Sequence, residues 1–145
     1  MAAICQRLTG GRLVAIDRSA TAIARATRRN ADCLASGRAV LRTDALEDLR
    51  PSDPPEATDG FDKVFAMNVN LFWVRSPARE LDLIRSLLRP GGTLSLFYGH
   101  GTPGQGAATV PGALLGHLEA GGFASEVRTG PGVAGVVSWL WRGSR

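Results

Sequence analysis

Residues 13–19 read Leu13-Val14-Ala15-Ile16-Asp17-Arg18-Ser19, a short apolar run that ends in an acid and a serine. Gly10-Gly11 precede it, and the pattern predicts a strand buried on both faces, followed by a helix with Ser19 as its N-cap. In a parallel α/β sheet, the carboxyl end of such a strand opens onto the ligand crevice. A carboxylate there can accept hydrogen bonds from both hydroxyls of a ribose, so we expect Asp17 to contact a nucleoside. The alternative is an acid that only caps the next helix, where the helix dipole favours negative charge.

The composition is that of one soluble domain. The chain has 145 residues, of which 44% are hydrophobic and 21% charged, and this length is enough for a substantial core. We therefore expect a single domain over residues 1–145. The apolar runs are too short to span a membrane, and residues 1–8 lack the pattern of a signal peptide, which predicts a cytoplasmic protein without a membrane partner.

The charged residues and the cysteines disfavour nucleic-acid and metal binding. The net charge is +4, but the arginines are dispersed and the longest basic run is Arg28-Arg29, a pattern typical of a solvated helix face. A nucleic-acid partner is therefore not expected. Cys5 and Cys33 lie far apart in the sequence without a second ligand pair, so we expect two reduced, packed thiols and no metal site.

The hydrophobic periodicity predicts an α/β fold whose mostly parallel sheet ends in an antiparallel β-hairpin. A tight turn over 129–132 separates the last two strands, and a turn that short joins only antiparallel neighbours. The helix after Ser76-Pro77 is expected to start with Ser76 as its cap and to bury Leu81, Ile84 and Leu88. The expected elements, in chain order, are a helix ending at Leu8, a strand over 13–17, a helix from Ser19 to Ser36-Gly37, a strand over 39–44, a short helical turn over 45–50, an irregular loop over 51–60, a strand over 61–68, the helix after Ser76-Pro77, a strand over 93–98, a helix over 113–120, and strands over 123–128 and 133–141.

Polar residues recur where the expected strands end. Asp44 closes the second strand one βα unit after Asp17, which places two carboxylates on the same rim of the sheet. Asn68 closes the third strand and is followed by the apolar stretch 71–73. An amide followed by aromatic residues is typical of a pocket floor and its apolar wall. The alternative is that these aromatic side chains pack under the next helix.

Four segments together resemble the class I S-adenosylmethionine-dependent methyltransferases, particularly the small-molecule type. The resemblance implies a Rossmann-like sheet, S-adenosylmethionine as cofactor and methyl transfer to a small-molecule acceptor. It implies that Asp17, with Arg18 beside it, holds the ribose hydroxyls, and that Asp44 with the backbone of Ala45 contacts the adenine amino group. It also implies that Asn68 lies beside the methionine portion. The matching segments are 14–19, 43–45, 61–68 and 88–94.

The sequence departs from that family's pattern at its start. The family's first strand and glycine-rich loop belong upstream of the helix over 2–8, and Gly10-Gly11 do not replace them because they precede the second strand of the family. We therefore expect a methyltransferase fold that is shortened at its N-terminus. The missing strand would lie between the strands that end in Asp17 and Asn68, and its loss would leave exposed sheet edges through which a homodimer can form.

Candidates for proton transfer and two rival functions complete the sequence-based hypotheses. Tyr98 and His100 follow the fourth strand and are the candidate general bases, whereas His117 lies on a helix and is expected to be structural. A nicotinamide-dependent dehydrogenase is disfavoured because its glycine fingerprint is absent. The stronger rival is a truncated, non-catalytic methyltransferase-like domain that serves as a partner or dimerisation module, with Trp139 and Trp141 near the contact.

Overall fold

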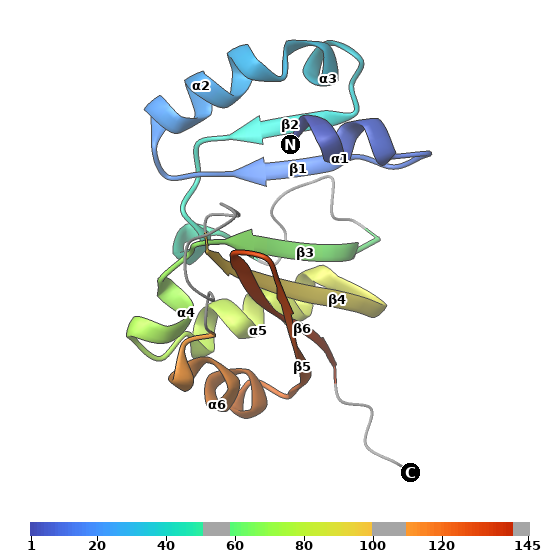
Figure 1. Cartoon of the computed structure of the whole chain (residues 1–145). Coiled ribbons are helices and arrows are strands. Elements are labelled where there is room, and N and C mark those ends of the chain that lie inside the picture. Colours follow the sequence, from blue (N-terminus) through green and yellow to red (C-terminus); the bar gives the residue numbers. More distant parts are fainter. Residues whose placement is uncertain (51–58, 100–109, 141–145) are drawn as a thin grey trace. The chain divides into compact units, whose positions relative to one another are not determined.

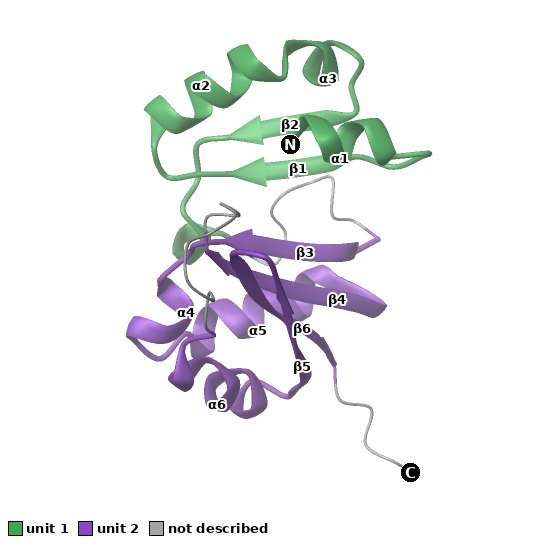
Figure 2. Ribbon diagram, in the orientation of Figure 1, with its two compact units in different colours: residues 1–56 green, residues 57–145 purple. Residues whose placement is uncertain are grey.

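The computed structural model describes residues 1–50, 59–99 and 110–140, which divide into two compact units. Unit 1 covers Met1–Glu56 and unit 2 covers Ala57–Arg145 (Figure 2). We describe each unit by itself, and the single domain expected from the sequence stays a prediction. The expected irregular loop over 51–60 lies largely outside the described residues, and His100 and Trp141 lie outside them entirely.

Unit 1 contains a two-stranded parallel ladder flanked by short helices. The ladder pairs Leu13 with Ala39 and Ile16 with Arg42, so both strands end at the same edge (Figure 1). This confirms the expected parallel βα pattern. The elements of the unit are α1 (Ala2–Arg7), β1 (Leu13–Ile16), α2 (Ala20–Arg29), α3 (Ala31–Ala35), β2 (Ala39–Arg42) and the 3-10 turn η1 (Leu46–Asp48).

The helical segment after β1 starts where the sequence predicts and breaks earlier than predicted. The Ser19 hydroxyl accepts a hydrogen bond from the Ala22 N–H, which confirms the expected N-cap. The expectation of one helix up to Ser36-Gly37 is wrong. The chain leaves helical geometry at Asn30 (φ −129°, ψ 29°), whose side-chain N–H donates to the Ala26 carbonyl. An asparagine side chain can compete with the helix backbone for a carbonyl in this way. A new helix, α3, begins at the next residue, Ala31.

The core of unit 1 is small. Cys5, Cys33 and Ala39 are buried together, and Met1, Leu13 and Leu34 pack against them. All four residues of β1 are half-buried, so the expectation of a strand buried on both faces is wrong. The physical reason is that β1 has β2 as its one ladder partner in the described chain, and a two-stranded ladder shields its strands less than a wide sheet.

Unit 2 is built on a four-stranded sheet of order β3-β4-β6-β5. The β3–β4 pair is parallel, and the pairs of β6 with β4 and with β5 are antiparallel, which confirms the parallel sheet that ends in a hairpin (Figure 1). The expected helix over 113–120 is also confirmed. The elements are β3 (Phe61–Met67), α4 (Leu71–Val74), α5 (Ala78–Leu87), β4 (Leu88–Gly99), α6 (Gly112–Ala120), β5 (Phe123–Gly130) and β6 (Val133–Leu140).

The start and the end of α5 both differ from the prediction. The N-cap is Pro77 and not Ser76: Pro77 is buried and its carbonyl accepts from the Leu81 N–H at 2.9 Å. The helix ends at Leu87, and Leu88 already pairs with Phe61 as the first residue of β4. Because Lys63 then pairs with Thr93, residues 89–92 form a wide bulge in β4 and not only a helix stop.

The helices of unit 2 supply its core. Helix α5 packs against β4, α6 packs against β5, and both α4 and α5 contact α6. The largest fully buried side chains of the unit come from the helices, the turn before α5 and the strands, and they are Phe72, Pro77, Leu81, Ile84, Leu94, Leu96, Leu114, Leu118, Val136 and Ser138. Phe65, Met67 and Trp139 remain exposed on the sheet. No helix in the described chain is long and apolar enough to cross a membrane.

Candidate functional site

Asp17 stands in the connection between β1 and α2, at the carboxyl end of β1. Its Oδ1 accepts a hydrogen bond from the Ser19 N–H at 2.8 Å, and its own N–H donates to the Arg42 carbonyl at 3.3 Å. The carboxylate is exposed and its Oδ2 has no partner among the described residues. One oxygen therefore shapes the turn before α2, and the other is available to a ligand hydroxyl. The two alternatives drawn from the sequence, helix capping and ligand contact, are geometrically compatible.

Asp44 follows β2 at the same edge of the unit 1 ladder. Its Oδ2 lies 2.6 Å from Nε of Arg42, and both side chains are half-buried. This ion pair holds the carboxylate in one place two residues beyond the strand. Ala45 follows as the N-cap of η1, and Arg18 is exposed next to Asp17. The structure thus brings the four cofactor candidates of unit 1 to the carboxyl ends of two adjacent parallel strands.

Asn68 lies at the carboxyl end of β3, where its side chain contacts the end of β4. It is the one non-glycine residue with positive φ (54°) in the described chain, a conformation that asparagine tolerates better than most residues. Its Nδ2 donates to the Gly99 carbonyl at 3.0 Å, and its Oδ1 accepts from the Gly99 N–H at 2.9 Å. The amide therefore mimics one more residue of the β3–β4 ladder and clamps the ends of the two strands together.

Tyr98 lies one residue before that clamp, with its side chain buried. Burial raises the pKa of its phenol from 10.0 to about 12. The hydroxyl donates a long hydrogen bond, 3.4 Å, to the Val69 carbonyl. A phenol with this pKa keeps its proton at neutral pH, which disfavours Tyr98 as the general base there.

The burial of Tyr98 predicts a loss of stability at high pH. Between pH 10 and about 12 the folded chain retains the phenolic proton while the unfolded chain releases it. The stabilisation is therefore fully present below pH 10 and is lost as the pH rises through about 12, and it amounts to at most roughly 3 kcal/mol. Because Tyr98 is the single tyrosine, phenolate absorbance reports it alone in a pH titration. We expect a midpoint near 12 in the folded chain and near 10 in urea, and coincident midpoints would contradict the burial.

The short helix α4 carries the aromatic residues that follow Asn68. Phe72 is buried, which favours the packing alternative for this side chain over a pocket wall. Its carbonyl lies 3.0 Å from Nδ1 of His117 on α6, so this histidine connects two helices. Trp73 is half-buried, and its indole Nε1 is buried without a partner in the described part of the chain.

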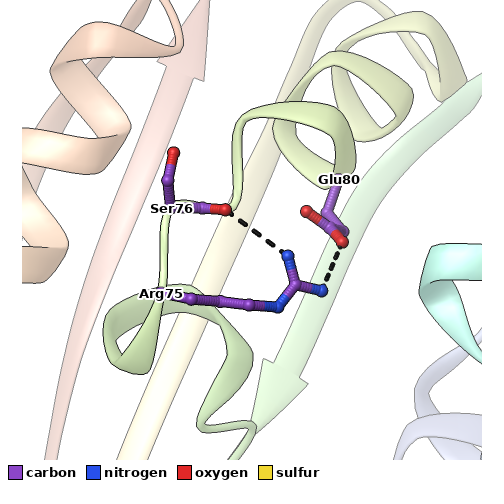
Figure 3. Close-up of polar contacts among 3 residues, drawn as sticks. All are labelled: Arg75, Ser76 and Glu80. Atoms are coloured by element: carbon purple, nitrogen blue, oxygen red, sulfur yellow. Dashed lines mark hydrogen bonds and ion pairs between the residues drawn. The ribbon is translucent and has the colours of Figure 1, made fainter.

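An ion pair that sequence reasoning missed joins α4 to α5. Glu80 on the first turn of α5 is 4% exposed, and its Oε1 accepts from Nη2 of Arg75 at 2.7 Å. Nη1 of Arg75 also reaches the Ser76 carbonyl at 3.4 Å (Figure 3). The other carboxylate oxygen, Oε2, is buried and unpartnered among the described residues. No spacing rule would find this pair, because its members lie five residues apart across the turn at Pro77.

The polar candidates thus fall into two groups. Asp17, Arg18, Asp44 and Ala45 share the ladder edge of unit 1, whereas Asn68 and Tyr98 share the ends of β3 and β4 in unit 2. His100 lies outside the described residues. Within those residues, no group of three or more histidine, cysteine, aspartate or glutamate side chains is placed to hold a metal ion.

Comparisons with solved structures give the same architecture. The chain resembles the DhpI–SAH complex structure with a TM-score of 0.65 and 22% identity, over 90% of this chain and 67% of that one. It resembles a SAM-dependent methyltransferase from Aquifex aeolicus with a TM-score of 0.71 and 14% identity, over 96% and 74% of the two chains. For an O-methyltransferase family protein from Burkholderia thailandensis the TM-score is 0.69 at 14% identity, over 99% of this chain and 48% of that one.

Sequence comparison gives the family. No curated protein matches the chain. Residues 1–92, well over half of the sequence, match the family described as methyltransferase domain. This match includes the first three segments that carry the resemblance seen in the sequence and most of the fourth, and the structural similarities agree with it. The chain therefore belongs to the methyltransferase-domain family and has the Rossmann-like fold of the class I methyltransferases, whose cofactor is S-adenosylmethionine.

Proposed function

We propose that the ladder edge of unit 1 binds the nucleoside part of S-adenosylmethionine and that the chain serves methyl transfer to a small-molecule acceptor. The observation that carries the proposal is the pair of carboxylates, Asp17 and Asp44, at the carboxyl ends of two adjacent parallel strands. Ligands of open α/β sheets bind at this edge. The similarity to a DhpI–SAH complex and a DhpI–SAM–HEP complex supports this cofactor.

The donor set fits the nucleoside. The free Oδ2 of Asp17 can accept a hydrogen bond from a ribose hydroxyl, while the bond from the Ser19 N–H to Oδ1 fixes the carboxylate. The ion pair with Arg42 fixes the position of Asp44, and a carboxylate is a strong acceptor for an adenine amino group. Ala45 follows Asp44 in the chain, and its backbone supplies the second proposed contact with the adenine amino group. Arg18 lies beside Asp17, the proposed ribose contact.

We propose that the residues of unit 2 contribute by contacting the methionine portion and by aligning the acceptor. Both polar ends of the Asn68 amide bind Gly99, so a contact with the methionine portion would come from its backbone and not from that amide. The cofactor supplies a methyl group on a sulfonium when it is bound. The chain's part is then to align the acceptor and to exclude water. Of the two sequence candidates for a base, the raised pKa of Tyr98 favours His100.

Calorimetric titration of S-adenosylhomocysteine into the 145-residue chain tests the proposal. We expect Asp17→Asn to weaken binding roughly tenfold, about 1.4 kcal/mol, because a neutral amide replaces a charged acceptor. The amide oxygen still accepts from the Ser19 N–H, so the turn and the circular dichroism spectrum should not change. Asp32→Asn is the matched control, since Asp32 is an exposed acid on α3 away from the ladder edge.

Two results would count against this assignment. Equal affinity in the Asp17→Asn variant and in the original chain would exclude Asp17 as the ribose contact. Absence of binding to the original chain would instead favour a non-catalytic partner module. The exposed Phe65, Met67 and Trp139 of the unit 2 sheet would then be the first surface to substitute in a sedimentation experiment.

A further inference from the structure

The two cysteines, which are distant in sequence, meet in the core of unit 1. Cys5 on α1 is 0% exposed, Cys33 on α3 is 8% exposed, and both belong to the same buried cluster. The structure confirms the expectation of two packed thiols and adds that they share one cluster. Both are free in this structure.

Arg38 ties the two cysteine backbones together. Its Nη1 donates to the Cys5 carbonyl at 3.2 Å, and its backbone N–H donates to the Cys33 carbonyl at 3.2 Å. One residue therefore connects α1 and α3. The two side chains belong to one buried cluster, and the neighbouring Cys5 thiol is the largest cause that raises the pKa of Cys33. Two thiols packed in one cluster on a braced backbone are placed for a disulfide to form with little backbone movement.

We propose that Cys5 and Cys33 form a reversible intramolecular disulfide by exchange with a low-molecular-weight disulfide such as glutathione disulfide. The site is independent of methyl transfer. The bond would close a loop that contains β1, Asp17 and α2. Cross-links of this kind stabilise a protein chiefly by restricting its unfolded chain.

The exchange balances in two steps. The Cys33 thiolate attacks one sulfur of glutathione disulfide, which forms a mixed disulfide and releases a glutathione thiolate that takes up the proton from Cys33. The Cys5 sulfur then attacks the Cys33 sulfur of the mixed disulfide and displaces the second glutathione, which leaves with the proton from Cys5. The two protein thiols are oxidised by two electrons, and glutathione disulfide is reduced to two thiols.

The environment makes this exchange slow at neutral pH and faster in alkali. The contact with Cys5 and burial raise the pKa of Cys33, and the positive charges of Arg38 and the Met1 amine oppose the increase only in part. The attacking species is the thiolate, so the rate of oxidation should rise as the pH is raised. Helix α1 has six residues and no side-chain N-cap bond, and its local opening can admit the oxidant because so short a helix has little stability of its own.

An equilibrium measurement on the whole chain tests the proposal. The reduced chain is incubated at pH 8 in glutathione buffers of graded ratio, once folded and once in guanidinium, quenched with acid and analysed by intact mass and peptide mapping. We expect the folded chain to lose two hydrogen atoms, to show the Cys5–Cys33 linked peptide, and to be oxidised at a glutathione ratio at least tenfold more reducing than the denatured chain requires. Dithiothreitol should restore both thiols.

The outcomes separate a disulfide site from ordinary packing. A folded chain that is oxidised no more readily than the denatured chain, or that carries only glutathione adducts, would overturn the proposal. Cys5→Ser and Cys33→Ser chains should give only mixed disulfides with glutathione. The main comparison uses the unsubstituted chain and so does not depend on the folding of either variant.

Discussion

Replacing Phe72 by alanine is expected to lower the free energy of unfolding by about 3–5 kcal/mol. The Phe72 ring is the one buried side chain of α4, and α4 packs against α6. Removal of the ring leaves a cavity between the two helices. The contact between His117 and the Phe72 carbonyl restrains the helices, so the cavity cannot close fully. Urea denaturation followed by circular dichroism measures the change.

The control for this substitution lies on the same helix. Val74 is exposed, and Val74→Ala should change the free energy of unfolding by no more than about 0.5 kcal/mol. If the free energy of unfolding falls equally little in both variants, α4 is not packed against α6 as described. The aromatic residues after Asn68 would then again be candidates for a pocket wall.

Replacing Arg75 by alanine is expected to cost about 3 kcal/mol, although Arg75 itself is half exposed. The cost comes from its partner: Glu80 is buried, its Oε2 has no partner in the described chain, and the substitution leaves the charge unpaired. Urea denaturation followed by circular dichroism measures the loss.

Two matched variants make this prediction specific. Glu80→Gln in the Arg75→Ala background removes the charge and should recover most of the lost stability. Arg85→Ala removes an arginine from an exposed pair with Asp82, and such a surface pair contributes no more than about 0.5 kcal/mol. Equal destabilisation by Arg75→Ala and Arg85→Ala would mean that Glu80 is hydrated.

The predictable parts of the fold are those governed by local rules. Ser19 caps α2 because a hydroxyl before an apolar-periodic segment satisfies the first free N–H groups, and residues 131–132 join β5 to β6 because so short a connection allows only a hairpin. The break at Asn30 could not be predicted in this way. It depends on a side chain that competes with the helix for the Ala26 carbonyl, and such competition is decided by the surrounding packing.

The candidate site also has parts that local rules predict and parts that they do not. Alternation of strands and acids was sufficient to place Asp17 and Asp44 on one edge, because parallel strands end together. The clamp of Asn68 on Gly99, the ion pair of Arg75 with Glu80 and the contact of Cys5 with Cys33 join residues that no local rule relates. They arise from the close approach of elements in the folded core. The raised pKa of Tyr98 likewise follows from burial, which the sequence of β4 alone does not reveal.

The strand order of unit 2 also has a consequence during protein synthesis. β6 lies between β4 and β5, yet it follows both of them in the chain. A ribosome must therefore deliver residues up to Leu140 before the sheet can form, and until then β4 presents Leu94 and Leu96 without their β6 neighbours. The ladder of unit 1 needs nothing beyond Arg42. During synthesis both strands of the first unit are thus available while the second unit still exposes an unpaired strand edge, the kind of surface that promotes aggregation.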